Sequence, residues 1–210
     1  MEEPTHEHDG LPDDFDWNDI YTGSAADYMP PDALTLELTE SLPVGDVLDV
    51  GCGAGGLLVA LAARGWRPSG VDVAGKAVAA ARAVCAARGV KATLVVGDAS
   101  TWRPSRTYDL VTNTFALPLT REAQVGAYCA IREAVAPGGT VILKDFDTGM
   151  AKVGPFGGCD LIEVAHLREA FEGFDIQRAE IVATPAHDHG AGGYGEARWT
   201  AALLVARRPG

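Results

Sequence analysis

The chain has 210 residues, of which 47% are hydrophobic and 22% charged, and its formal net charge is −12 at pH 7. This length and composition suit one domain with a full core, and no apolar run approaches the roughly 20 residues that span a bilayer. Nucleic-acid-binding proteins need a basic surface to neutralise phosphates, so the acidic balance excludes a nucleic-acid or membrane partner from our expectations and favours a small molecule.

The first 14 residues are acidic and lack the basic and apolar regions of a secretory signal. We therefore expect a cytoplasmic location, with a flexible acidic tail over 1–14 and one domain over 15–210. The protein is expected to be a monomer or a homodimer. The four cysteines are widely spaced and form no C-x-x-C pair. They are predicted to be buried small apolar residues, with no disulfide framework and no metal site: Cys52, Cys85, Cys129 and Cys159.

The first half of the chain is predicted to alternate between helices and strands. The pattern is helical from 16–21 to 35–41, where Pro30 and Pro31 open a helix at Asp32. Apolar runs and helix stops after that point predict strands at 46–50, 68–73, 91–98 and 108–113, and helices at 56–65 and 75–89.

The second half continues the alternation and then breaks it. A helix beginning at Thr120 is predicted to stop at Pro137-Gly138-Gly139, with Val125, Tyr128, Cys129 and Val135 on one face. A strand at 140–147, a helix at 160–173 and strands at 174–183 and 197–208 follow. Because no helix separates the last two strands, the last strand is predicted to run antiparallel. The fold class is therefore α/β: a doubly wound, seven-stranded, mostly parallel sheet that binds ligands at the carboxyl ends of its strands.

The stretch VLDVGCGAGG, residues 47–56, links the first strand to a helix. Gly51, Gly53 and Gly56 satisfy G-x-G-x-x-G, which is the spacing of a dinucleotide-binding turn. Asp49, however, lies two residues before the first glycine, where a carboxylate would repel a diphosphate in a low-dielectric crevice. S-adenosylmethionine has no phosphate and carries an ammonium and a sulfonium, so Asp49 favours this cofactor over a nicotinamide dinucleotide.

Two further carboxylates end the second and third strands at the same sheet edge. Asp72 is placed to accept hydrogen bonds from both ribose hydroxyls, although nicotinamide enzymes also carry an acid there. Asp98 is placed to accept from the exocyclic amine of adenine, while Ala99 offers a backbone amide to the ring. Each carboxylate taken alone is also consistent with a loop or capping role, but three in this register favour a nucleoside site.

These motifs resemble the class I S-adenosylmethionine-dependent methyltransferases over 15–208. VLDVGCGAGG is similar to their first motif, GVDV to the ribose acid, VVGDAS to the adenine acid, YDLVTNTFALPL to the fourth-strand motif and APGGTVIL to the strand-five motif. Within that superfamily, DWNDIY, DFDTG and LREAFEGFDIQRAEI are similar to the tellurite-resistance and thiopurine-type methyltransferases. The resemblance implies methyl transfer to a small-molecule O, S, N or chalcogen nucleophile without a metal.

The resemblance also implies the members of the site. The cofactor-binding set is Asp49, Gly51, Cys52, Gly53, Gly55, Asp72, Val73, Asp98, Ala99, Asn113 and Trp17. Trp17 and Tyr21, four residues apart on one predicted helical face, are expected to fold over the cofactor, or else to dock a helix on the sheet edge. Phe115 is expected to face the sulfonium, or else to be a core aromatic. Tyr21 and Phe115 would border the acceptor.

The acceptor side is expected to include the long connection between the last two strands. His187, His189 and Arg198 are the candidate catalytic residues there, for binding an anion or taking up a proton, and the alternative is a solvated loop. A His-x-His metal site lacks a third well-spaced ligand. The rival functions are a non-catalytic S-adenosylmethionine-binding module and a nicotinamide-dependent oxidoreductase. A third rival, a protein or RNA methyltransferase, is opposed by the net charge of −12 and by NTFA, which stands where nucleic-acid amino-methyltransferases carry Asn-Pro-Pro-aromatic.

Overall fold

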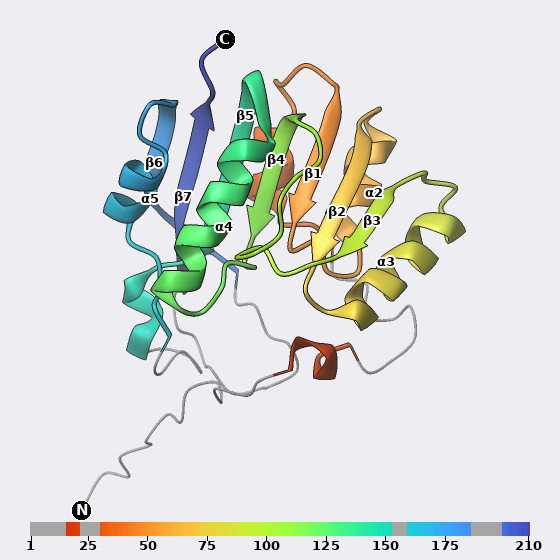
Figure 1. Ribbon diagram of the computed structural model, residues 1–210, viewed down its shortest axis with the longest axis horizontal. Coiled ribbons are helices and arrows are strands. Elements are labelled where there is room, and N and C mark those ends of the chain that lie inside the picture. The colour runs from red at the N-terminus through yellow and green to blue at the C-terminus, as the bar shows by residue number, and fades with distance from the viewer. Residues whose placement is uncertain (1–15, 22–29, 153–158, 186–198) are drawn as a thin grey trace, which may run out of the picture.

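Seven strands form a single sheet in the order β3-β2-β1-β4-β5-β7-β6 (Figure 1). The computed structural model describes residues 16–21, 30–152, 159–185 and 199–210. The strands are β1 (Asp46–Val50), β2 (Arg67–Asp72), β3 (Thr93–Val96), β4 (Tyr108–Thr114), β5 (Val135–Phe146), β6 (Asp175–Thr184) and β7 (Trp199–Arg207).

The sheet direction agrees with the prediction. β1 runs parallel to both β2 and β4, and β5 runs parallel to β4. β7 lies between β5 and β6 and is antiparallel to both. The strand order reverses between β1 and β4, so the carboxyl ends of these two strands border the crevice in which open α/β sheets bind ligands.

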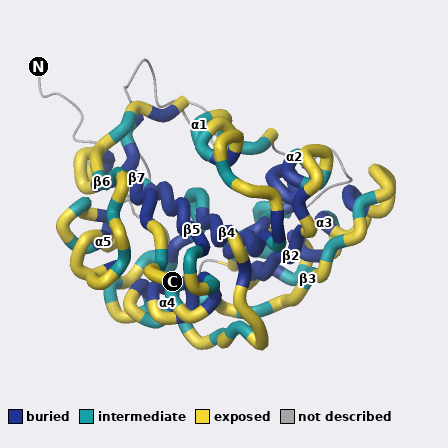
Figure 2. Tube along the Cα trace, turned by 90° about the horizontal axis from the view of Figure 1, so that it is seen from above, coloured by how far each residue is buried: buried dark blue, intermediate teal, exposed yellow. Residues whose placement is uncertain are grey.

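Helices cover both faces of the sheet (Figure 2). α1 (Ala33–Leu38), α2 (Gly56–Ala63) and α3 (Gly75–Ala87) lie on one face, and α4 (Arg121–Ala134) and α5 (Val164–Ala170) on the other. Both faces of the central strands carry buried apolar side chains, because neighbouring residues of a strand point to opposite faces of the sheet. Val47 and Leu110 pack with Leu61 of α2, while Leu48 and Val111 pack with Ile131 of α4 and Leu167 of α5.

The structure corrects three predicted boundaries. Residues 16–21 contain only a 3₁₀ helix, η1 (Trp17–Asp19), and α1 is short, although Asp32 caps it as expected. α5 begins at Val164, because Ile162 instead forms a strand-like bridge with Asp147. β5 begins directly after α4 at Val135 rather than at 140, since the residue before Pro137 is sterically excluded from the helical region.

The predicted apolar face of α4 is right only in part: Tyr128 is buried as expected, and so is Val135, which belongs to β5. Val125 and Cys129 are exposed, whereas Gln124, Tyr128 and Ile131 are buried toward the sheet. The buried face consists largely of alanines, which give a weak apolar signal beside Val125. Of the four cysteines, Cys52 and Cys85 are buried as predicted, Cys129 is exposed and Cys159 is partly exposed.

Candidate functional site

The turn between β1 and α2 requires glycine by conformation and by contact. Gly51, Gly53 and Gly55 all have positive φ, at 79°, 50° and 83°. A methyl group added at Gly51 would overlap the side chain of Ala116, which follows β4. The glycine turn and the residues after β4 are therefore in direct contact at the carboxyl edge of the sheet.

The backbone amides of this turn are used by the protein itself. The N–H groups of Gly51 and Cys52 donate to the carbonyl of Val71, over 2.7 and 3.1 Å. The Gly53 N–H donates to Asp72 Oδ2 over 2.8 Å, and that of Gly55 donates to the Cys52 carbonyl. A phosphate site needs such amides to face the ligand. Because these four N–H groups donate to acceptors within the protein, they do not form a phosphate site.

Asp49 and Asp72 are two buried carboxylates beside the glycine turn. Asp49 is 4% exposed and accepts a hydrogen bond from Thr112 Oγ1 over 2.7 Å. Burial, with a smaller contribution from the charge of Asp72, raises the pKa of Asp49 to about 7, against the effect of the Thr112 hydrogen bond. Burial also raises the pKa of Asp72, although the amides of Ala74 and Gly53 oppose the rise.

This electrostatic arrangement fits a ligand with positive charge. Among the described residues, no ion pair includes Asp49 or Asp72. Two carboxylates that raise each other's energy inside a protein are stabilised by a cation and destabilised further by an anion. S-adenosylmethionine, with its ammonium and sulfonium, fits this donor and acceptor set, whereas a diphosphate does not.

The predicted adenine end lies at the sheet edge after β3. Asp98 is exposed, and its Oδ1 accepts from the N–H and hydroxyl of Ser100, over 2.8 and 2.7 Å. Asp98 thus makes a local turn in the structure, while Ala99 packs partly buried against the core. Val73, after β2, is 48% exposed. The adenine role of these residues stays a prediction.

The end of β4 lies next to the glycine turn. Asn113 is fully buried and donates from Nδ2 to the Val50 carbonyl over 2.8 Å, so it ties β4 to the end of β1. Its Oδ1 is buried and accepts no hydrogen bond from the described residues. Phe115 has a positive φ of 54°, a strained conformation for an aromatic residue, and its ring stacks on Phe146 at 4.5 Å.

The N-terminal segment reaches the same edge, but not as an α-helix. The i, i+4 argument for Trp17 and Tyr21 fails, because η1 is a single 3₁₀ turn. Asn18 Oδ1 instead accepts the N–H of Lys76 at the start of α3, which anchors η1 beyond the carboxyl ends of the strands (Figure 1). The Tyr21 hydroxyl lies 3.1 Å from the position that a Cβ at Gly53 would occupy.

His187, His189 and Arg198 lie outside the described residues, so their predicted catalytic role stays a prediction. Sequence reasoning missed three other groups on β5. Lys144 and Asp145 are buried in this strand, and Asp147 follows it, also buried. The signal was available, because KDFD places three charges at the end of an otherwise apolar strand.

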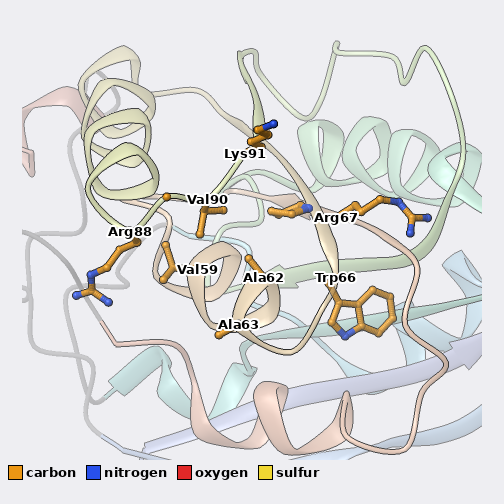
Figure 3. Close-up of a pocket in the computed structure, with 10 residues that line it drawn as sticks. Val59, Ala62, Ala63, Trp66, Arg67, Arg88, Val90 and Lys91 are labelled. Atoms are coloured by element: carbon orange, nitrogen blue, oxygen red, sulfur yellow. The ribbon is translucent and has the colours of Figure 1, made fainter.

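A separate groove of about 570 Å³ opens at the opposite end of the molecule (Figure 3). It lies where α2 and α3 end and β2 begins, and Val59, Trp66, Arg67 and Lys91 are among its lining residues. None of its lining residues belongs to the glycine turn.

Within the described ranges, no helix has the length and apolar character to cross a membrane.

Residues 47–139 match the sequence profile of a family described as "Methyltransferase domain". The chain is 35% identical over 121 residues to the 2-heptyl-1-hydroxyquinolin-4(1H)-one methyltransferase of Mycobacteroides abscessus, covering 56% of this chain and 53% of that protein. It is 40% identical over 117 residues to the ribosomal protein L11 methyltransferase of Geobacter metallireducens, covering 55% and 37%. The chain spans only about a fifth to about half the length of such curated relatives.

Solved structures show the same fold. A structure titled "Conversion of a Disulfide Bond into a Thioacetal Group during Echinomycin Biosynthesis" has a TM-score of 0.70 at 24% identity, covering 87% of this chain and 84% of that one. The glycopeptide N-methyltransferase MtfA, solved with S-adenosylmethionine, has a TM-score of 0.60 at 21% identity, covering 90% and 91%. At these identities the likeness is one of fold.

Proposed function

We propose, on the premise that the chain carries a class I S-adenosylmethionine-dependent methyltransferase domain with its core at 47–139, that it methylates a small molecule. The observation that carries the proposal is the pair of buried carboxylates, Asp49 and Asp72, beside a glycine turn whose amides face inward. This combination suits a cation-bearing nucleoside. The cofactor supplies a methyl group already activated on a sulfonium.

The chain's own residues bind and orient in this proposal. Asp49, when ionised, complements the ammonium, while Asp72 and Asp98 accept from the ribose and the adenine. Asp72 also holds the Gly53 amide, so the ribose and methionyl ends of the site are linked through one side chain. Ala116 closes the turn against Gly51, so the residues after β4, with Phe115 before Ala116, place the acceptor side next to the cofactor side. Alignment and water exclusion then supply much of the acceleration.

A small-molecule acceptor is supported by charge and by one relative. The chain has a net charge of −12, and NTFA stands where base methyltransferases have Asn-Pro-Pro-aromatic. One relative is named for a hydroxyquinolone, although others are named for ribosomal RNA and ribosomal protein L11. A thiolate or chalcogen anion needs no strong base, whereas a hydroxyl does, and His187 or His189 is the candidate base.

The test is methyl transfer from radiolabelled S-adenosylmethionine to a defined panel. The panel contains 2-heptyl-1-hydroxyquinolin-4(1H)-one, thiophenol and tellurite, with ribosomal RNA and protein L11 as macromolecular acceptors. We expect turnover of at least one small molecule, its loss in Asp72→Ala, and no change in Asp175→Ala, which alters an exposed carboxylate. Turnover of RNA or L11 alone would overturn the acceptor class, and cofactor binding without any turnover would favour a non-catalytic module.

A further inference from the structure

Lys144 and Asp32 form a buried ion pair at the acceptor side of the sheet edge. Lys144 Nζ lies 2.6 Å from Asp32 Oδ2, and the two side chains are 1% and 8% exposed. Lys144 belongs to β5, whereas Asp32 precedes α1, so the pair joins segments 112 residues apart. Two charges removed from water in this way are expensive unless the surrounding geometry satisfies both.

The surroundings of Lys144 do satisfy it. Besides Asp32, its ammonium donates to Thr184 Oγ1 over 3.0 Å and lies 5.0 Å from the centre of the Phe115 ring. Its main-chain carbonyl also accepts the N–H of Phe115 over 2.9 Å. Lys144 therefore holds Phe115 by both its backbone and its side chain, and it has no exposed face with which to bind an acceptor.

Asp32 completes a closed ring that returns to Phe115. Its Oδ1 accepts from the N–H and the hydroxyl of Thr35, over 2.8 and 2.9 Å, and the Thr35 hydroxyl lies 3.4 Å from that of Thr114. Thr114 is the residue before Phe115. The pair thus holds the strained turn after β4 at Thr114 and Phe115, while Asp145 Oδ2 accepts the Leu117 N–H over 2.8 Å on the far side of the turn.

We infer that Lys144 and Asp32 are positioning residues, which hold Phe115 and the turn after β4 so that the acceptor side of the site is aligned. The inference rests on the proposed function, because the turn contacts Gly51 of the cofactor side. The pair sets the alignment of the acceptor and leaves the cofactor affinity to Asp49 and Asp72.

The first measurement is amide hydrogen exchange of the full chain, which needs no acceptor. In Lys144→Met we expect peptides containing 115–117 to exchange at least 10-fold faster, while peptides containing 51–53 keep their rate. Asp32→Asn tests the negative charge of the pair separately, because asparagine is also a good N-cap and should preserve the start of α1. The matched control is Arg178→Met, because the side chain of Arg178 is 37% exposed and its Nε lies 2.7 Å from Glu180 Oε1. Unchanged exchange at 115–117 in Lys144→Met would overturn the inference.

The second measurement separates positioning from folding. With whichever probe of the panel turns over, we expect Lys144→Met to lower kcat/KM at least 10-fold, with a change of less than threefold in the dissociation constant of S-adenosylhomocysteine. Lys144→Arg, which keeps the charge, should recover part of the loss. If either single variant fails to fold, the double variant Lys144→Met/Asp32→Asn removes both charges and takes its place. Wild-type kcat/KM in the folded variants would contradict the inference, whereas failure of the wild type to bind S-adenosylhomocysteine would contradict the proposed function.

Discussion

The carboxylate of Asp72, at the end of β2, accepts a hydrogen bond from the backbone N–H of Gly53 over 2.8 Å. Its other oxygen accepts the N–H of Ala74 over 2.9 Å. One side chain therefore connects the glycine turn to the start of α3. The acid expected to hold the ribose also organises the backbone around the cofactor.

Replacing Asp72 is expected to affect binding and folding together. In Asp72→Ala two amides lose their acceptor, and we expect a loss of stability of about 1–3 kcal/mol for these unpaired groups. The affinity for S-adenosylhomocysteine should fall at least about 10-fold. Calorimetric titration and thermal unfolding, with Asp175→Ala as the control at an exposed carboxylate, check both effects. Wild-type affinity in a folded Asp72→Ala protein would remove Asp72 from the site.

The titration of Asp49 predicts how stability depends on pH. Its pKa is raised from 3.8 to about 7, so between these values the folded chain keeps a proton that the unfolded chain has lost. Stability from this group is therefore fully present below about pH 4, falls as pH rises and levels off above about 7. Asp145, whose pKa burial raises to about 6, adds to the same slope.

Asp49→Asn isolates the contribution of Asp49, because it removes the charge and keeps an acceptor for Thr112. We expect this variant to exceed the wild type in unfolding free energy by on the order of 2 kcal/mol at pH 8, with the difference gone near pH 4. Urea unfolding at the two pH values measures it. A variant that is less stable than the wild type at pH 8 would show that the buried charge has an unseen partner.

The affinity for the cofactor is expected to rise with pH, whereas the stability contributed by Asp49 falls. The ionised form of Asp49 complements an ammonium, so the affinity for S-adenosylhomocysteine should rise from pH 6 to pH 8, by up to about 10-fold per unit below the pKa. Asp49→Asn should bind more weakly at pH 8 and show little dependence on pH. Calorimetric titrations at three pH values test this expectation. If the affinity rose equally in the wild type and in Asp49→Asn, the pH dependence would belong to another group.

Two glycines with similar backbone angles separate strain from contact. Gly51 has φ 79° and touches Ala116, whereas Gly89 has φ 66° and no atom within 4 Å of an added Cβ. Gly89→Ala should cost about 1 kcal/mol, from the left-handed conformation alone. Gly51→Ala must also displace the residues after β4, so we expect a cost above about 3 kcal/mol and no detectable cofactor binding. Equal unfolding free energies for the two variants would refute the contact.

The sheet could be predicted from sequence because its signals are local. Valine and leucine mark the strands at 46–50 and 108–113, and the glycines at 65 and 89 follow their helices where expected. The antiparallel β7 followed from the missing helix before it. The boundary at Val135 failed because the helix was expected to continue to Pro137, whereas the steric effect of Pro137 on the residue before it already ends α4 at Ala134, and Val135 pairs with Tyr108 of β4.

The candidate site could be predicted only in part. The carboxylates of Asp49 and Asp72 at the ends of β1 and β2, and of Asp98 after β3, were visible, because strand ends in a parallel sheet meet at one edge. The Lys144–Asp32 pair was not, since it joins residues 112 positions apart and the charges of KDFD do not indicate which residue Lys144 contacts. The one-face argument for Trp17 and Tyr21 assumed an α-helix that η1 does not form, although Tyr21 still lies beside Gly53.

Calorimetric titration of the full chain with S-adenosylhomocysteine and, separately, with NADH tests the account most directly. A crevice with two buried carboxylates, neither of which forms an ion pair with a described residue, should bind the methyltransferase product with a dissociation constant in the micromolar range and should not bind the diphosphate of NADH. Tight binding of NADH, lost in Gly51→Ala and accompanied by no response to S-adenosylhomocysteine, would contradict the reading of the glycine turn and the function drawn from it.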